Sequence, residues 1–129
     1  MNKKKEYKVL VIDDSEVNLF LIKSIFEDQT DIKISIENNS RKAMKNIKEK
    51  QPDLILLDLM MPHVDGYQIL EELNEDEKLK SIPVIVISAK SDRDSVAKAF
   101  EYNIVDYIKK PIVLPDIENK IRMALQKNE

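Results

Sequence analysis

Five side chains that can bind a metal ion or a phosphoryl group come directly after short stretches that we expect to be strands, most of them apolar. They are Asp13 and Asp14 after Val9–Ile12, Asp58 after Leu54–Leu57, Ser88 after Pro83–Ile87, and Lys110 after Asp106–Lys109. Carboxylates are ligands of hard divalent cations such as Mg²⁺, which also accept phosphate oxygens. A lysine ammonium and a serine hydroxyl can each bind a phosphoryl oxygen. The set therefore has the parts needed for attack by Asp58 on phosphorus, with an aspartyl phosphate as the product.

The apolar stretches predict the element that brings these side chains together. Val9–Ile12, Leu54–Leu57 and Pro83–Ile87 lack polar alternation, which is typical of strands covered on both faces in a parallel sheet. Ile32–Glu37 and Asp106–Lys109 are weaker strand candidates. In an open parallel sheet, ligands bind outside the carboxyl ends of the strands. The acid that ends a buried run is thus expected at the half-wet rim of the sheet, since burying an unpaired carboxylate is costly.

Between these strands, apolar residues recur every three or four positions, as in amphipathic helices. The expected buried faces are Val17, Leu21 and Ile25; Ala43, Met44 and Ile47; Gly66, Ile69, Leu70 and Leu73; Val96, Ala97 and Phe100; and Ile117, Ile121, Ala124 and Leu125. Ser15, Ser40 and Ser91 are expected helix caps, and Pro115 suits the first turn of the last helix. Strand followed by helix, five times over, predicts an α/β sandwich with right-handed crossovers.

Composition limits the class of protein. The 129 residues, with 43% hydrophobic and 35% charged, indicate one soluble globular domain. A formal net charge of -3 argues against direct nucleic-acid binding, which needs a surplus of Lys and Arg. The absence of cysteine excludes disulfides, thiolate metal sites and cysteine nucleophiles. The basic start has only a short apolar run, so we expect residues 1–6 to be an N-terminal tail of a cytoplasmic protein that does not contact the membrane.

At this point four stretches match a known family. VLVIDDSEVNLFLIKSIFE, PDLILLDLMMPHVDG, PVIVISAK and DYIKKP, in this order and spacing, closely resemble the receiver domain of bacterial two-component response regulators, of the chemotaxis-regulator type. The likeness extends from about Tyr7 to the end of the chain. It implies a single receiver domain over residues 1–129 with a flavodoxin-like (βα)5 fold. In that fold a five-stranded parallel sheet of strand order 2-1-3-4-5 carries helices on both faces.

The resemblance also implies the chemistry of the rim. Asp58 would accept a phosphoryl group from a phosphohistidine on a sensor histidine kinase or phosphotransfer protein. Asp14, Asp58 and the backbone carbonyl of Met60 would hold the Mg²⁺, and Asp13 would act chiefly through a bound water. Such a domain catalyses its own phosphorylation and slow dephosphorylation and is not a turnover enzyme.

The family's switch has counterparts as well. Ser88 and Lys110 would bind the phosphoryl oxygens, and the bond between Lys110 and Pro111 is expected to be cis. Movement of Ser88 toward the phosphoryl group would let Tyr107 turn inward. That change would alter the surface of the fourth helix, fifth strand and fifth helix, by a shift between two existing arrangements. This surface would contact a downstream protein target or output domain, and family members can also form homodimers through it.

A few positions depart from the family pattern or carry no clear role. Asn103 stands where glycine is frequent and is the non-glycine residue best suited to a left-handed turn. Met60 and Lys90 occupy positions that tune phosphate lifetime in the family. We expect Phe100 in the core and Tyr102 on the surface.

Three functions are compatible with these residues. A phosphorylatable switch is preferred because every required polar group is present. The first alternative is a phosphorylation-independent, receiver-like protein-binding module. The second is a phosphatase of the haloacid dehalogenase type, disfavoured because IDDSE has adjacent acids where that class spaces them two apart. The cognate kinase, output partner, phosphate lifetime, oligomeric state and pathway stay open, as does the choice between a stand-alone regulator and part of a longer regulator or hybrid kinase.

Overall fold

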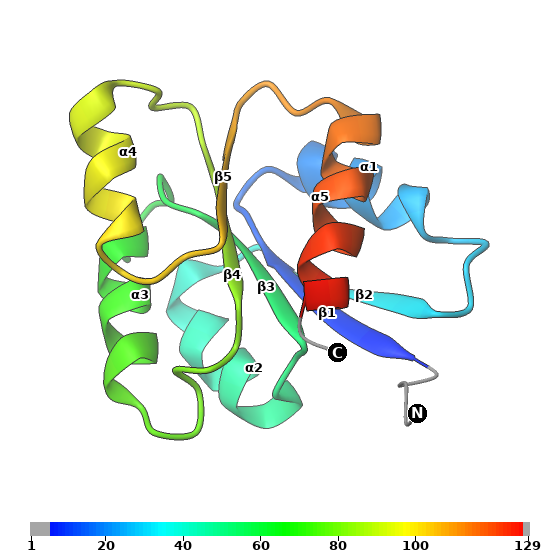
Figure 1. Ribbon diagram of the computed structural model, residues 1–129, viewed down its shortest axis with the longest axis horizontal. Coiled ribbons are helices and arrows are strands. Elements are labelled where there is room, and N and C mark those ends of the chain that lie inside the picture. Colours follow the sequence, from blue (N-terminus) through cyan, green and yellow to red (C-terminus); the bar gives the residue numbers. More distant parts are fainter. Residues whose placement is uncertain (1–5, 128–129) are drawn as a thin grey trace.

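Strands and helices alternate along the residues that the computed structural model describes, 6–127 (Figure 1). In chain order the elements are β1 Tyr7–Ile12, α1 Glu16–Ile25, β2 Ile32–Glu37, a 3₁₀ turn Ser40–Lys42, α2 Ala43–Lys50, β3 Leu54–Asp58, α3 Gly66–Glu75, β4 Val84–Ser88, α4 Arg93–Phe100, β5 Asp106–Lys109 and α5 Leu114–Lys127. All five predicted strands are present, including the two weaker candidates. No helix within residues 6–127 is long and apolar enough to cross a membrane.

The strands form one parallel sheet in the order β2-β1-β3-β4-β5, which confirms the flavodoxin-like topology. β1 lies between β2 and β3, so the strand order reverses at β1. The register pairs Ile12 with Leu57 and Asp58 with Ile87. The residues that follow β1, β3 and β4 therefore meet at one edge, where open α/β sheets bind their ligands.

Helices cover both faces of the sheet, α1 and α5 on one side and α2, α3 and α4 on the other (Figure 1). Alternate residues of the central strands supply the two cores: Val9, Val11, Leu54 and Leu56 on the α1 side, and Leu10, Ile12, Ile55 and Leu57 on the α2 side. Each fully buried leucine or isoleucine contributes about 1.5–3 kcal/mol. Burial on both faces explains why these strands show no polar alternation.

The buried face of α1 differs from the prediction. Leu19, Ile22 and Phe26 pack into the core, whereas Val17 on the predicted face is 68% exposed. Apolar residues line two sides of this helix, so their periodicity alone did not select the side that contacts the sheet. The predicted cap is present, because the Ser15 side chain accepts a hydrogen bond from the Asn18 N–H.

Two other predicted caps are wrong. Asn39, one residue before Ser40, caps the 3₁₀ turn, because its side chain accepts from the Arg41 N–H. Asp92, one residue after Ser91, caps α4 by accepting from the Ser95 N–H. Ser40 is instead buried, and its hydroxyl donates to the Pro62 carbonyl and accepts from the Val64 N–H. It supports the loop after β3.

The predicted burial of the aromatic residues near the end of α4 is also reversed. Phe100 is 48% exposed, and Ala99 is the one residue of α4 that is buried. Tyr102 instead packs against the core, its ring 6.0 Å from the ring of Tyr67. Asn103 has a φ of 64°, the left-handed turn expected of it.

Candidate functional site

Three carboxylates converge at the carboxyl edge of the sheet. Asp13 and Asp14 follow β1, and Asp58 is the last residue of β3. One carboxylate oxygen of each lies within 4.8 Å of the others. Asp13 and Asp58 are 0% and 1% exposed, whereas Asp14 is exposed. The structure thus brings together the three acids that the sequence places after the first and third strands, with Asp14 on the solvent side.

Lys110 supplies the positive charge of this pocket. Its Nζ lies 3.0 Å from Oδ2 of Asp58 and 3.3 Å from Oδ2 of Asp13. The backbone N–H of Lys110 donates to the Ser88 carbonyl, 2.9 Å away, which ties the lysine to β4. The bond between Lys110 and Pro111 is cis. One ammonium group therefore bridges the two buried carboxylates.

Asp13 is held by a contact that sequence reasoning missed. Its Oδ1 accepts the backbone N–H of Ser15 at 2.9 Å, and its Oδ2 accepts from Nδ2 of Asn18 at 3.3 Å. Asn18 lies in the first turn of α1, three residues after the cap. The sequence does contain a signal for this contact, because Asn18 carries an amide in the first turn of a helix that begins directly after the acidic pair. These bonds fix the orientation of a carboxylate that has no access to solvent.

The environment changes the pKa values of the central pair. Burial raises the pKa of Asp58 to about 6, and the nearby charge of Asp13 adds to this, although hydrogen bonds from Met60 and Lys110 oppose it. Burial alone would lower the pKa of Lys110, but its hydrogen bond to Asp58 and the charge of Asp13 outweigh burial and raise it. The pocket therefore favours a cationic lysine and moves the pKa of Asp58 upward, closer to neutral pH.

Ser88 and Tyr107 are connected through one residue. Ser88 ends β4 and is fully buried, and its Oγ accepts the backbone N–H of Lys90 at 3.1 Å. The hydroxyl of Tyr107, on β5, donates to the carbonyl of the same Lys90 at 2.7 Å. The backbone of Lys90 is thus bonded to both residues that the family's switch would use.

The loop after β3 completes the pocket. The backbone N–H of Met60 donates to Oδ1 of Asp58 at 2.9 Å, while the Met60 side chain is 51% exposed. His63 is exposed in a left-handed conformation, with φ of 75°, and its Nδ1 lies 3.2 Å from Nη2 of Arg41. Both carboxylate oxygens of Asp58 are therefore engaged by hydrogen-bond donors.

The donor set fits a hard divalent cation. Oxygen atoms of three aspartates face one another, and among the described residues no histidine joins the group. Like charges held this close repel unless a cation lies near them, a role that Lys110 fills for two of the three. All-oxygen sites with one exposed side suit Mg²⁺ or Mn²⁺, which retain water ligands.

A doubly wound parallel sheet with an acidic pocket at its switch point and a lysine on the last strand's end is the architecture of a signalling receiver domain. The sequence profile of the response regulator receiver domain matches residues 9–122, and the chain belongs to this family, whose general role is phosphorylation-dependent switching in two-component systems.

Known proteins agree with this assignment. The probable C4-dicarboxylate response regulator DctR of Bacillus subtilis is 36% identical over 96% of this chain and 53% of its own length. The Francisella response regulator 1452 receiver domain superposes with a TM-score of 0.87 at 26% identity, covering 96% of this chain and 100% of its own. The Mn²⁺-bound form of response regulator Rcp1 has a TM-score of 0.75 at 28% identity, covering 93% and 90%. The chain spans about half the length of the first curated relatives it matches.

Proposed function

We propose that this chain is a single cytoplasmic receiver domain in which Asp58 accepts a phosphoryl group from a phosphohistidine on a sensor histidine kinase or phosphotransfer protein. A carboxylate oxygen of Asp58 forms the new O–P bond while the N–P bond breaks. The electron pair of that bond returns to the imidazole of the donor. The observation that carries the proposal is the convergence of three aspartates with Lys110 3.0 Å from the acceptor carboxylate.

Asp13, Asp14, Asp58 and the backbone carbonyl of Met60 would hold a Mg²⁺ ion. When bound, the ion supplies positive charge to the carboxylates and to the phosphoryl oxygens. The fit of the all-oxygen donor set supports this, as does the Mn²⁺-bound form of the related Rcp1. The hydrogen bonds from Ser15 and Asn18 keep Asp13 oriented toward the same space.

Lys110 would change partners during the reaction. Before transfer its ammonium bridges Asp58 and Asp13. Once Asp58 is esterified, the acceptor loses its own charge and the phosphoryl oxygens carry the negative charge. The ammonium then binds a phosphoryl oxygen without leaving the pocket. Transfer therefore needs little rearrangement of the lysine.

The switch would run through the backbone of Lys90. If the Ser88 hydroxyl turns to a phosphoryl oxygen, it releases the Lys90 N–H that it accepts in this structure. The loop that carries Lys90 is then free to move. Because the Tyr107 hydroxyl donates to the Lys90 carbonyl, the Tyr107 side chain would move with the loop. The surface of α4, β5 and α5 changes as a result. A downstream protein or output domain would bind there, or a second copy of the chain.

The donor would dock on the open side of the pocket. Val17 and Phe20 of α1 are 68% and 69% exposed, and Val113, just before α5, is 60% exposed. α1 and α5 lie in contact beside the exposed Asp14. Exposed apolar side chains on α1 and just before α5 are suited to contact with the protein that presents the phosphohistidine.

Intact-mass measurement after incubation with acetyl phosphate tests the chemistry. The wild-type chain should gain one phosphoryl adduct in Mg²⁺, lose it in hydroxylamine and gain none in EDTA. Asp58→Asn should gain none, whereas the matched control Asp28→Asn, an exposed acid outside the pocket, should behave as wild type.

Absence of an adduct with acetyl phosphate and with a panel of phosphorylated histidine kinases would contradict the proposal. It would favour the phosphorylation-independent binding module. In that case Asp58→Asn should leave partner affinity unchanged.

A further inference from the structure

β2 is an edge strand with a free side. It pairs only with β1 among the strands of the described residues. The N–H of Tyr7 donates to the Asp31 carbonyl, and that of Asp13 to the Glu37 carbonyl, so the odd-numbered residues of β2 face β1. Backbone groups alternate between the two edges of a strand. The N–H and C=O groups of Ile32, Ile34 and Ile36 therefore face outward.

The two sides of this free edge differ in chemistry. On the α1 side, a hollow of about 410 Å³ is lined by Glu16, Leu19, Phe20, Lys23, Ile36, Glu37 and Asn38. Its apolar part is well exposed, since Phe20 is 69% and Ile36 41% accessible. Side chains of alternate residues in a strand added here would enter this hollow, and apolar ones would fit it.

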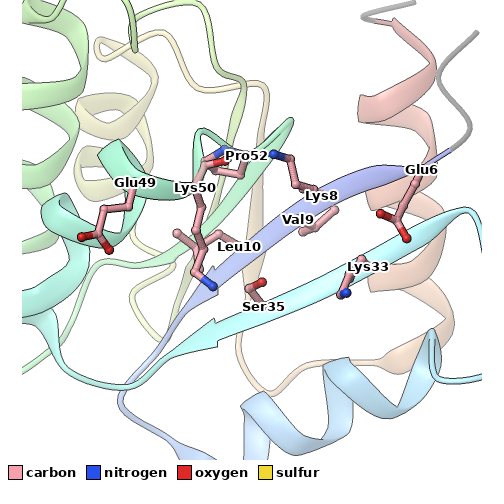
Figure 2. Close-up of a pocket in the computed structure, with 9 residues that line it drawn as sticks. All are labelled: Glu6, Lys8, Val9, Leu10, Lys33, Ser35, Glu49, Lys50 and Pro52. Atoms are coloured by element: carbon pink, nitrogen blue, oxygen red, sulfur yellow. Dashed lines mark hydrogen bonds between the residues drawn. The ribbon is translucent and has the colours of Figure 1, made fainter.

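On the α2 side the edge carries more basic than acidic side chains. A pocket of about 300 Å³ has three lysines and two glutamates in its lining, Lys8, Lys33, Lys50, Glu6 and Glu49, together with Ser35 (Figure 2). In this view the amino ends of Lys33 and Lys50 lie on either side of the Ser35 hydroxyl. A neighbouring hollow along α2 adds Lys42 and Lys45.

Most of the positive charge on this side has no internal partner. Within residues 6–127, no hydrogen bond or ion pair engages the ammonium groups of Lys33, Lys42, Lys45 or Lys50. Glu37, the one acid of β2, is already occupied, because its two carboxylate oxygens accept from the Asn46 side chain and from the Asn39 N–H. The unpaired cations therefore favour acidic side chains in whatever binds.

We propose that β2 is a docking edge for an extended segment of a partner protein in which apolar and acidic residues alternate. The segment adds to the sheet as a sixth strand, its backbone bonding to Ile34 and Ile36. Its apolar side chains enter the hollow beside Phe20, and its acidic side chains meet Lys33 and Lys50. Backbone bonds give such a complex affinity and the two hollows give it specificity.

A second copy of the chain fits this edge less well. Two copies paired through β2 would bring their α2 helices close together. Residues 41–50, which contain α2, carry five basic side chains and one acidic one. Repulsion between two such helices disfavours self-pairing, whereas an acidic segment neutralises them.

Fluorescence anisotropy with a labelled octapeptide that alternates valine and aspartate tests the proposal. It should bind the wild-type chain saturably, and the valine–lysine counterpart should not. Lys33→Glu and Lys50→Glu should each weaken binding about fivefold. The matched control Lys48→Glu changes the charge of α2 as much as Lys50→Glu does. Lys48 lies outside the hollows along the β2 edge, so this variant should weaken binding less.

A pair of variants separates the backbone contribution from the side chain. Ile36→Pro removes an outward N–H, which an edge strand tolerates, and should abolish binding, whereas Ile36→Ala should only weaken it. Two further peptides, N-methylated at one or the other set of alternate backbone amides, extend the test. Only the peptide whose methylated amides face β2 should lose affinity.

Absence of saturable binding up to about 1 mM peptide would overturn the proposal. An equal loss of peptide affinity in Ile36→Pro and Ile36→Ala would also overturn it. So would tighter binding of duplex DNA or anionic vesicles than of the peptide, if Ile36→Pro left that binding unchanged. Concentration-dependent dimers that Ile36→Pro removes, seen by sedimentation, would identify a second copy as the occupant instead.

Discussion

Two features of the pocket have opposite effects on the ionisation of Asp58. Its burial raises the pKa to about 6, while Lys110 at 3.0 Å keeps the ionised form accessible at neutral pH. At a pH close to its pKa, a buried carboxylate is largely free of hydrating water and is still ionised in a substantial fraction of molecules. Both properties favour its attack on phosphorus. This balance has consequences for stability and for metal binding.

Asp58→Asn should stabilise the metal-free protein at neutral pH. The pKa of Asp58 is 3.8 when unperturbed and about 6 when folded, so the unfolded chain releases its proton first as pH rises. The stability contributed by the protonated carboxyl is present below about pH 4 and lost by about pH 6 to 7. In urea unfolding with EDTA, the variant should exceed wild type by about 2–3 kcal/mol at pH 7.5 and match it near pH 4. A wild-type protein that gains on the variant with rising pH would contradict this.

The same proton should compete with Mg²⁺. Below a pH of about 6 the Asp58 carboxyl is protonated and cannot serve as a ligand. Calorimetric titration should show wild-type Mg²⁺ affinity falling up to about tenfold for each pH unit below that value. Asp58→Asn, as the matched control, should bind more weakly and with a shallower pH dependence. An affinity that is flat from pH 5 to 8 would exclude Asp58 as a ligand.

At this scale the sequence predicts the polar groups well and their supports poorly. Asp13, Asp14, Asp58, Ser88 and Lys110 follow from one rule about strand ends. The contact of Asn18 with Asp13 had only a weak signal, an amide in the first turn of the helix that follows the acidic pair, and the contacts of Lys90 depend on a backbone direction that no residue pattern encodes. Lys90 acts through its backbone, which is the same in every residue except proline.

At the scale of elements, Gly66 shows how closely α3 approaches the loop after β3. A Cβ at this position would lie 2.5 Å from Cα and 2.9 Å from the carbonyl oxygen of Leu59. Gly66→Ala should therefore cost about 3 kcal/mol in chemical denaturation, because backbone must move to relieve the overlap. Glu72→Ala, on an exposed turn of the same helix, is the control and should change stability little. Equal effects of the two substitutions would refute the steric account.

Tyr67 should govern how firmly α4 is attached. Its hydroxyl donates to the Ser95 carbonyl at 3.1 Å, and Nζ of Lys98 lies 4.2 Å from the centre of its ring. Tyr67→Phe removes the hydrogen bond, worth about 1 kcal/mol, and Tyr67→Leu removes the cation–π contact as well. Hydrogen exchange over residues 93–100 should accelerate in that order, while β3 stays protected. Uniform acceleration across the chain would indicate a general loss of stability instead.

The elements themselves follow from the sequence more readily than their orientation does. The strands were predictable because burial on both faces leaves a continuous apolar run. The side of α1 that packs was not, because Val17 and Leu19 lie on opposite apolar stripes and only tertiary packing distinguishes them. Exposure of Phe100 likewise reflects how little of α4 touches the sheet.

At the scale of the molecule, protein donors and small donors should use different surfaces. Phe20→Ser removes an exposed aromatic side chain of α1 and leaves the three acids unchanged. Phosphotransfer from the histidine kinase or phosphotransfer protein that labels wild type fastest should slow about tenfold or more, corresponding to about 1.4 kcal/mol or more. Labelling by acetyl phosphate should be unchanged. Met123→Ser, at an apolar position of α5 that is 50% exposed, is the control. Slowing with both donors would place the defect in the acidic pocket itself.

Two of the three helices over one face of the sheet, α2 and α3, carry opposite charge. Residues 41–50, around α2, carry five basic side chains and one acidic one, and residues 65–77, around α3, carry six acidic side chains and no basic one. Both helices pack on the same core. The molecule thus has an electric dipole across this face, despite a net charge of only -3. An approaching partner would be turned into alignment before it touches the surface, so association rates should fall with ionic strength more steeply than the net charge implies.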